Sequence, residues 1–326
     1  MNLVTDDYPA APMTAHSRVT IDCDVLPRFT AAYLRIAGDE CAFIEAHTSH
    51  ALPKLLAALE ANGKKPEQVR YLVVTHAHLD HAAGASAVLA ACPNATLVAH
   101  PRAAKNLIDP ARLIAGATQV YGAERFAKLY GTIAPIPQER VRTLADGETL
   151  DLGDAKLQAL HTAGHAWHHF AVDDPALSTV YTGDTFGLVY PALQRGIRFA
   201  LATTSPTGFH AAEARKSVDR ILALGREAAC LTHFDEVRDL AECARQVHDW
   251  IDLSDQWVQE AATSSLTGKE LETSLSEKLR AAIAEDTSAR GLALTAEDWE
   301  VLALDIELNG QGLAYAVGEL RKAPKP

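Results

Sequence analysis

The chain has 326 residues, of which 48% are hydrophobic and 22% charged, a balance typical of a globular protein with one large domain or a domain plus an accessory segment. Its formal net charge is −12 and Lys and Arg form no cluster, which argues against a nucleic-acid or membrane partner. No apolar run approaches the ~20 residues that span a bilayer, and residues 1–17 lack the pattern of a secretory signal. We therefore expect a cytoplasmic protein with a small-molecule substrate.

The cysteines are scattered and include no C-x-x-C pair, which argues against a disulfide framework and against a thiolate zinc site. We expect reduced, mostly buried thiols at Cys23, Cys41, Cys92, Cys230 and Cys243.

The first two thirds of the chain show the pattern of a mixed α/β core. Apolar runs at 31–36 and 41–46 flank Gly38-Asp39 and predict a β-hairpin. Leucines at helical spacing predict a helix over 50–62. Further strands are expected at 71–75, 95–99, 157–161, 179–182 and 228–232, and further helices over 82–91, in pieces within 103–130 and over 211–224.

After about residue 238 the pattern becomes helical, over 239–263, 268–286 and 295–304, where Thr-Ala-Glu-Asp predicts an N-terminal cap. We therefore predict a catalytic domain over 1–238 and a helical C-terminal extension over 239–326. The leucines of its last helix would cover either the core or a partner subunit, so a homodimer stays open: Leu302, Leu304 and Leu308.

Four residues that commonly bind metals occupy six positions in His76-Ala-His78-Leu-Asp80-His81, directly after the apolar strand 71–75. In extended chain, residues i and i+2 point the same way, so His76 and His78 are expected to face one metal together. A turn would then direct Asp80 and His81 to a second position nearby. Imidazole and carboxylate groups suit zinc, iron or manganese.

Three further candidate ligands each follow a predicted strand: His165, Asp184 and His233. Taken alone, each also fits an ordinary turn or surface role. Together they suggest one site, because strand ends at one sheet edge are where α/β proteins place their functional groups.

The segments Thr75-His-Ala-His-Leu-Asp-His81, His161-Thr-Ala-Gly-His165, Tyr181-Thr-Gly-Asp-Thr185 and Leu231-Thr-His233 resemble, in order and spacing, the metallo-β-lactamase-fold superfamily and its glyoxalase-II-like metal-dependent hydrolases. The resemblance covers about residues 18–235 and implies an α/β fold, the αββα sandwich, here with the helical extension. It also implies the ligand sets: His76, His78 and His165 for a first metal, Asp80, His81 and His233 for a second, and Asp184 as a bridge.

The sequence departs from the family pattern in two places. Glu45-Ala-His-Thr48 stands where relatives often carry Asp-Thr-Gly, which leaves open whether His47 faces the site. His169 matches a supporting histidine behind the ligands, and His168 is additional, with a solvent position as its simpler interpretation.

The function implied is a dinuclear hydrolase that uses a metal-bridging hydroxide, with Asp80 as a catalytic residue that orients the nucleophile or takes a proton. Two divalent ions are expected, Zn²⁺ first, with Fe or Mn as alternatives. The expected substrate is a small ester or thioester.

The segment after Asp184 is expected to wall the substrate pocket through Phe186, Tyr190 and Arg198, with Phe209, Pro191 and Pro206 nearby. Arg195 or Arg198 would pair with a substrate carboxylate. No tyrosine lies three residues after Asp184, where lactonase relatives tend to carry one.

Several alternatives remain open at this stage. A mononuclear iron enzyme similar to persulfide dioxygenases keeps the His-x-His pair, and a lactone or phosphodiester hydrolase would use the same ligands. Flavo-di-iron relatives carry Glu in place of His78 and add a flavodoxin domain. The charge of −12 argues against a nuclease, and a complete ligand set argues against a non-enzymatic module.

Overall fold

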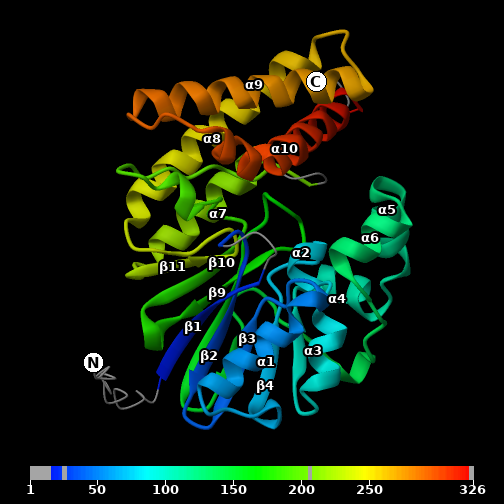
Figure 1. The fold of residues 1–326 in the computed structure, drawn as a ribbon, viewed down its shortest axis with the longest axis vertical. Coiled ribbons are helices and arrows are strands. Elements are labelled where there is room, and N and C mark those ends of the chain that lie inside the picture. Colours follow the sequence, from blue (N-terminus) through cyan, green and yellow to red (C-terminus); the bar gives the residue numbers. More distant parts are fainter. Residues whose placement is uncertain (1–15, 24–27, 205–207, 323–326) are drawn as a thin grey trace, which may run out of the picture.

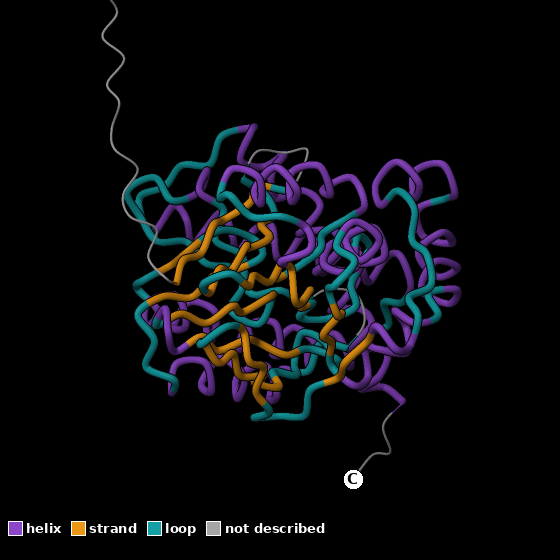
Figure 2. The backbone as a smooth tube through the Cα atoms, turned by 90° about the horizontal axis from the view of Figure 1, so that it is seen from below, coloured by secondary structure: helices purple, strands orange, loops and turns teal. Residues whose placement is uncertain are grey.

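The computed structural model describes residues 16–23, 28–204 and 208–322. Within them, two six-stranded sheets pack face to face with helices outside, which confirms the predicted αββα sandwich (Figure 1). The strands lie in the interior of the molecule with the helices around them (Figure 2). The described residues do not include residues 1–15, which make up most of the N-terminal segment in which we found no secretory pattern. They also do not include Pro206.

Each sheet follows chain order along its strands. The first sheet consists of β1 (His16–Asp22), β2 (Ala31–Ala37), β3 (Glu40–Ile44), β4 (Val69–Val73), β5 (Thr96–Ala99) and β6 (Val141–Thr143). The second, in the order β12 to β7, consists of β7 (Thr149–Leu152), β8 (Ala155–His161), β9 (Phe170–Asp174), β10 (Thr179–Gly183), β11 (Ala228–Leu231) and β12 (Glu236–Val237).

The helices of the sandwich are α1 (Leu52–Ala61), α2 (Leu79–Ala82), α3 (Ala85–Ala91), α4 (Pro101–Ile108), α5 (Ala111–Tyr121), α6 (Ala123–Tyr130) and α7 (Ala211–Ala223). The C-terminal helices are α8 (Leu240–Ala262), α9 (Gly268–Ala289) and α10 (Ala296–Lys322). None of the described helices combines the length and apolar composition needed to cross a membrane.

Strand β2 shows why the first sheet forms from a continuous apolar run. Successive side chains of a strand point to opposite faces, and both faces of this strand are covered. Tyr33 packs into the core between the two sheets, whereas its neighbour Leu34 packs with Leu55 of α1 and Val88 of α3 on the outer face. The sheet is thus buried on both sides.

A buried ion pair crosses between the sheets. Arg35 lies two residues after Tyr33, and its guanidinium group binds the carboxylate of Asp174 at the end of β9. Both side chains are 0% exposed. A charge in such a place depends on its partner, because desolvation of either ion alone is costly.

The C-terminal helices share the main core. Trp250 of α8, Ile283 of α9 and Leu302 of α10 belong to the same buried cluster as the inner faces of the sheets. Figure 1 shows these helices together over the end of the sandwich at which α2 begins. Leu304, by contrast, is 41% exposed. The division of the chain at residue 238 stays a prediction.

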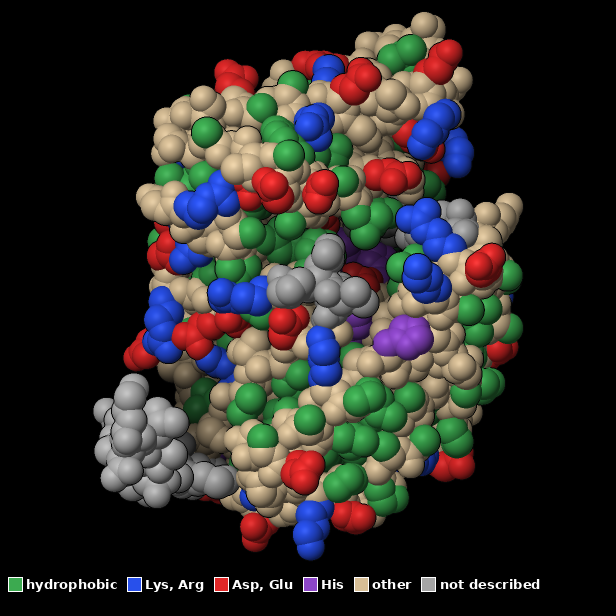
Figure 3. Space-filling model, in the orientation of Figure 1, with side chains coloured by type: hydrophobic (Ala, Val, Ile, Leu, Met, Phe, Trp, Pro, Cys, Tyr) green, Lys and Arg blue, Asp and Glu red, His purple; other side chains and the backbone are tan. Residues whose placement is uncertain are grey.

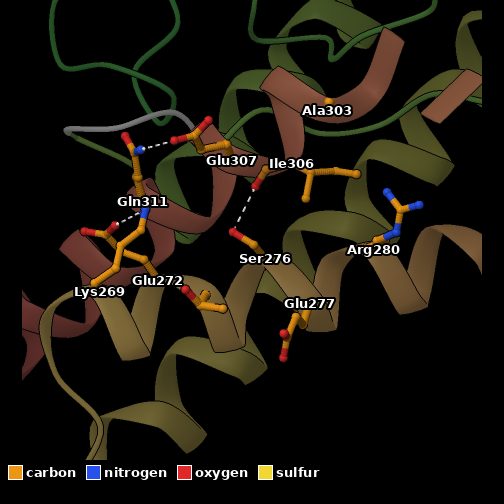
Figure 4. Close-up of a pocket in the computed structure, with 10 residues that line it drawn as sticks. Lys269, Glu272, Ser276, Glu277, Arg280, Ala303, Ile306, Glu307 and Gln311 are labelled. Atoms are coloured by element: carbon orange, nitrogen blue, oxygen red, sulfur yellow. Dashed lines mark hydrogen bonds and ion pairs between the residues drawn. The ribbon is translucent and has the colours of Figure 1, made fainter. Parts of the chain in front are cut away.

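Helix α10 begins with the expected capping arrangement and is held closely against α9. The backbone N–H of Thr295 donates to Asp298, whose own N–H donates to the Thr295 hydroxyl. At Gly310 a β-carbon would lie 2.0 Å from the Ser276 hydroxyl oxygen, so any larger residue would require that hydroxyl to move. The Ser276 hydroxyl donates to the Ile306 carbonyl at 3.3 Å, at the floor of a groove between the two helices (Figure 4).

We expect Arg35→Ala to lower the free energy of unfolding by about 3–5 kcal/mol, because it leaves the Asp174 carboxylate buried without a partner. Urea denaturation measures the change. Arg70→Ala is the control, since Arg70 and Glu40 form an ion pair with side chains 47% and 34% exposed, where a loss of at most about 1 kcal/mol is expected. Equal losses in the two variants would contradict a special role for the inter-sheet pair.

Candidate metal centre

The seven predicted ligands lie together at one end of the sandwich. His76 and His78 follow β4, and Asp80 and His81 lie in the short helix α2, so the expected turn after His78 is a helical one. His165, Asp184 and His233 follow β8, β10 and β11. The strand ends belong to both sheets, so the argument from one sheet edge was too simple: the site forms where the two sheets meet.

The first cluster consists of three histidines. The Nε2 atom of His165 lies 3.3 Å from Nε2 of His76 and 3.0 Å from Nδ1 of His78. One ring nitrogen of each residue lies within 4.8 Å of the others, a spacing that suits a shared metal ion.

The second cluster has one carboxylate and two histidines. An Asp80 oxygen lies 3.2 Å from Nε2 of His233 and 3.5 Å from Nε2 of His81. These three residues also satisfy the 4.8 Å spacing. The Asp80 side chain is 41% exposed, whereas those of His81 and His233 are buried, so Asp80 lies on the open side of the cluster.

Asp184 lies between the two clusters. Its Oδ2 atom is 3.4 Å from Nε2 of His165, in the first cluster. Its Oδ1 atom is 3.2 Å from Nε2 of His81 and 3.7 Å from Nε2 of His233, in the second. The two oxygens of one carboxylate thus face different clusters.

The donor atoms of this site fit divalent metal ions. Two of them, Nε2 of His81 and Oδ1 of Asp184, are buried and make no hydrogen bond. Buried polar atoms in native proteins are nearly always satisfied, so these two atoms, which lie 3.2 Å apart among other ligand-type groups without a hydrogen bond, indicate a group that binds there. Neutral imidazoles and carboxylates are ligands of zinc, iron and manganese.

Glu45 holds the second cluster from behind. Its carboxylate lies 3.0 Å from Nδ1 of His81 and accepts hydrogen bonds from the hydroxyls of Thr75 and Thr232. This contact orients the His81 ring so that Nε2 faces the cluster. Glu45 has a positive φ of 70°, a conformation that a non-glycine residue rarely adopts, and the sequence offered no sign of it.

His169 contacts the backbone of Asp184. Its Nε2 accepts from the Asp184 backbone N–H at 3.2 Å, and its Nδ1 contacts the hydroxyls of Thr162 and Thr185. Gly183 allows this approach: it has a φ of 50°, and a β-carbon there would lie 2.5 Å from His169 Nε2. The backbone of Asp184 is fixed by these contacts.

His165 is supported by Thr203 directly and by Asn309 indirectly, and sequence analysis connected neither residue to the site. The Thr203 hydroxyl lies 2.9 Å from Nδ1 of His165 and also donates to the Asp184 carbonyl. The next residue, Thr204, is bound through its backbone N–H and hydroxyl to Asn309 of α10. The C-terminal extension therefore supports the first cluster.

The two histidines of uncertain role lie at the edge of the site. The half-buried His168 ring stacks on His76 with ring centroids 6.0 Å apart. Nδ1 of His47 contacts the Thr48 hydroxyl, and the His47 carbonyl accepts from the Gly84 N–H next to α2. His47 thus supports the backbone near the second cluster, and neither residue belongs to a set with metal-ligand spacing in the described chain.

The predicted pocket residues are distributed unevenly. Tyr190 lies at the site, with its ring edge-on to His233 at 6.4 Å and stacked on Phe29 at 4.7 Å. Phe186 is fully buried in the core. Arg198 forms a two-point ion pair with Asp239, so its guanidinium group is already engaged.

Arg195 forms a similar two-point pair with Asp298, and Phe209 packs partly buried against the core. The structure therefore gives the predicted arginine–carboxylate contact no support. Trp167, which the sequence analysis passed over, is 45% exposed only two residues after His165. Figure 3 shows histidine side chains in a hollow between the C-terminal helices and the body of the molecule.

The histidine pKa values are shifted in opposite directions in the two clusters. Burial and neighbouring imidazoles lower the pKa values of His76 and His78, and burial lowers that of His165. Burial also acts to lower the pKa of His81 and His233, but the carboxylates of Asp184 and Asp80 outweigh it, raising the pKa of His233 to about 9 and that of His81 well above its usual range.

Comparison with known proteins agrees with this architecture. The family described as "Metallo-beta-lactamase superfamily" matches residues 26–233. An archaeal protein of that superfamily from Sulfolobus tokodaii is similar in structure, with 18% identity, 91% of this chain and 97% of the other covered, and a TM-score of 0.63. None of the curated proteins matches the chain at a significant level.

Two further solved structures share the fold. A metallo-beta-lactamase family protein from Thermus thermophilus is 17% identical over 93% of this chain and 92% of its own, with a TM-score of 0.59. A chemotaxis sensor captured as a peroxy diiron species is 11% identical over 73% and 89%, with a TM-score of 0.50. At such identities the likeness establishes the fold alone.

We expect Glu45→Ala to weaken metal binding at the second cluster about 10- to 100-fold, because His81 loses the acceptor that orients it. Competition with a chromophoric chelator measures the affinity. Glu60→Ala, at an exposed position of α1, is the control. An unchanged affinity in Glu45→Ala would exclude the orienting role.

We also expect a pH difference between the two positions. At pH 7 the metal-free first cluster is unprotonated, whereas the raised pKa values keep His81 and His233 protonated, so an ion at the second position must displace protons. Its affinity should rise about tenfold per pH unit for each proton released between pH 6 and 8. Zinc titrations at several pH values would contradict this if both positions showed the same slope.

Proposed function

The chain belongs to the metallo-beta-lactamase superfamily, and from this membership we propose that it is a metal-dependent hydrolase with two divalent ions, Zn²⁺ in the first instance, at the site described above. His76, His78 and His165 would hold one ion. Asp80, His81 and His233 would hold the other, and Asp184 would bind both.

The position of Asp184 is the observation that carries this proposal. A carboxylate with one oxygen toward each cluster is suited to two neighbouring ions, and a single-metal site would need only one of these oxygens. The unsatisfied atoms on His81 and Asp184 support the same assignment.

Divalent ions at these positions would supply a hydroxide nucleophile at neutral pH and polarise the carbonyl of the substrate. The protein's own contribution is to fix the ligands through Glu45, His169 and Thr203, and to place Asp80 where a nucleophile and substrate arrive. Burial acts to raise the pKa of Asp80, but His81 and His233 hold it well below its usual range, so the carboxylate is charged and would be able to accept a hydrogen bond from a nucleophile.

A small ester or thioester is the proposed substrate class. The site has the exposed Asp80 carboxylate and, against His233, the buried aromatic rings of Tyr190 and Phe29, a combination suited to a small acyl group. A cytoplasmic location, which suits the five free and buried cysteines, belongs to the same proposal.

Metal analysis of the purified, chelator-free protein by mass spectrometry tests the proposal, followed by a panel of thioesters, esters, lactones and phosphodiesters. We expect close to two zinc ions per chain and turnover of a thioester or ester. Close to one iron per chain, with oxygen uptake on a persulfide, would favour the dioxygenase alternative instead.

We expect Asp184→Ala to lose the second metal ion and to lower turnover at least about 100-fold, because its carboxylate directs one oxygen toward each cluster. Asp219→Ala, at an exposed position of α7, should keep both metal and activity. His47→Ala should change the rate only mildly. Full metal content and rate in Asp184→Ala would show that the bridging assignment is wrong.

A further inference from the structure

Helix α10 brings a carboxylate to the second cluster. Asp305 lies one turn before Asn309, the residue that binds Thr204, so both side chains face the sandwich. The groove-side contacts of Ser276 with Ile306 and Gly310 hold the same part of the helix from the opposite side (Figure 4). The position of Asp305 is thus fixed from two directions.

A short series of contacts joins Asp305 to the site. The Tyr190 hydroxyl donates to one carboxylate oxygen of Asp305 at 3.0 Å. The Tyr190 ring lies edge-on to the ring of His233 and is stacked on Phe29. Tyr190, Phe29 and Asp305 therefore form one wall beside the second cluster, with Asp305 as its charged group.

The other carboxylate oxygen of Asp305 has no hydrogen-bond or ion-pair partner among the described residues, although the side chain is only partly exposed. Burial and the nearby Asp184 and Asp80 raise its pKa to about 7, while His233 and Tyr190 act to lower it. A half-buried carboxylate next to other acids is unfavourable without a positive partner. Sites that break local rules in this way are commonly functional.

The positive charge that acts on Asp305 within the described protein is that of His233, which does not bond to its carboxylate directly. Arg195 and Arg198, the basic residues that follow Tyr190, are each bound to another aspartate. The second oxygen of Asp305 is therefore open to a positive group of a ligand.

We propose that Asp305 positions the substrate by binding a protonated amino group, so that the hydrolase acts on esters or thioesters that carry an amine. The inference rests on the proposed function. The net charge of −12 favours the approach of a cationic substrate over an anionic one. The ammonium group would donate to the free oxygen of Asp305, while Tyr190 keeps the carboxylate in place.

Binding of small thiols to the zinc-loaded, full-length protein tests this without turnover. The thiolate is a zinc ligand, and the alkyl chain of the thiol can end in either an amine or a hydroxyl group. Aminoalkanethiols of two to five carbons are compared by calorimetry with hydroxyalkanethiols of the same length. We expect at least one amine to bind about tenfold more tightly than its hydroxyl counterpart, as for a charge-assisted hydrogen bond. In Asp305→Asn, which can still accept from Tyr190, this preference should disappear.

Glu307→Gln is the matched control, since this exposed residue of the same helix lies on the groove side and contacts Gln311 (Figure 4). It makes the same charge change and should keep the preference. Tyr190→Phe should retain the preference in weaker form, because the carboxylate remains but is less well held.

The inference is overturned if thiols bind with no preference for the amine, or if Asp305→Asn and Glu307→Gln change the preference equally. If the protein takes up zinc and binds thiols without preferring the amine, this inference fails but the proposed metal centre stands. A protein that takes up no zinc and binds no thiol overturns the proposed function and this inference with it.

Discussion

Burial of several histidines and Asp184 at one end of the sandwich is the constraint on which the rest of the site depends. Imidazoles and carboxylates lose hydration when they are buried, and His81 and Asp184 keep atoms without any hydrogen bond. Such an arrangement persists only if surrounding groups hold each ring and carboxylate in place. Glu45, His169 and Thr203 do this, each through a polar contact to the far side of a candidate ligand.

These supporting residues explain why the two sheets and the C-terminal helices form one unit. Glu45 follows a strand of the first sheet yet binds Thr232, which follows a strand of the second. The ion pair of Arg35 and Asp174 joins the sheets farther from the site. Asn309 brings α10 to the loop that carries Thr203. The geometry of the candidate ligands therefore depends on packing across the whole molecule.

The parts of the structure that sequence analysis predicted are those with a local signal. The motif over 76–81 concentrates four ligand-type residues after an apolar strand, and the three later candidates follow strands in a recognisable order. Strands β1, β6, β7, β9 and β12 were missed. Of these, β1 and β6 have polar, mostly half-buried side chains that do not alternate clearly, and the buried β9 ends in two aspartates, which are uncommon in strands. The roles of Glu45 and Asp305 depend on a positive φ and on a contact between residues 115 positions apart, neither of which leaves a local pattern.

The most direct test of the account is a crystal structure of the zinc-loaded protein, with anomalous difference maps collected on both sides of the zinc absorption edge. We predict two peaks, one surrounded by His76, His78 and His165 and the other by Asp80, His81 and His233, with Asp184 in contact with both. A single peak, or two peaks that Asp184 does not join, would contradict the dinuclear centre.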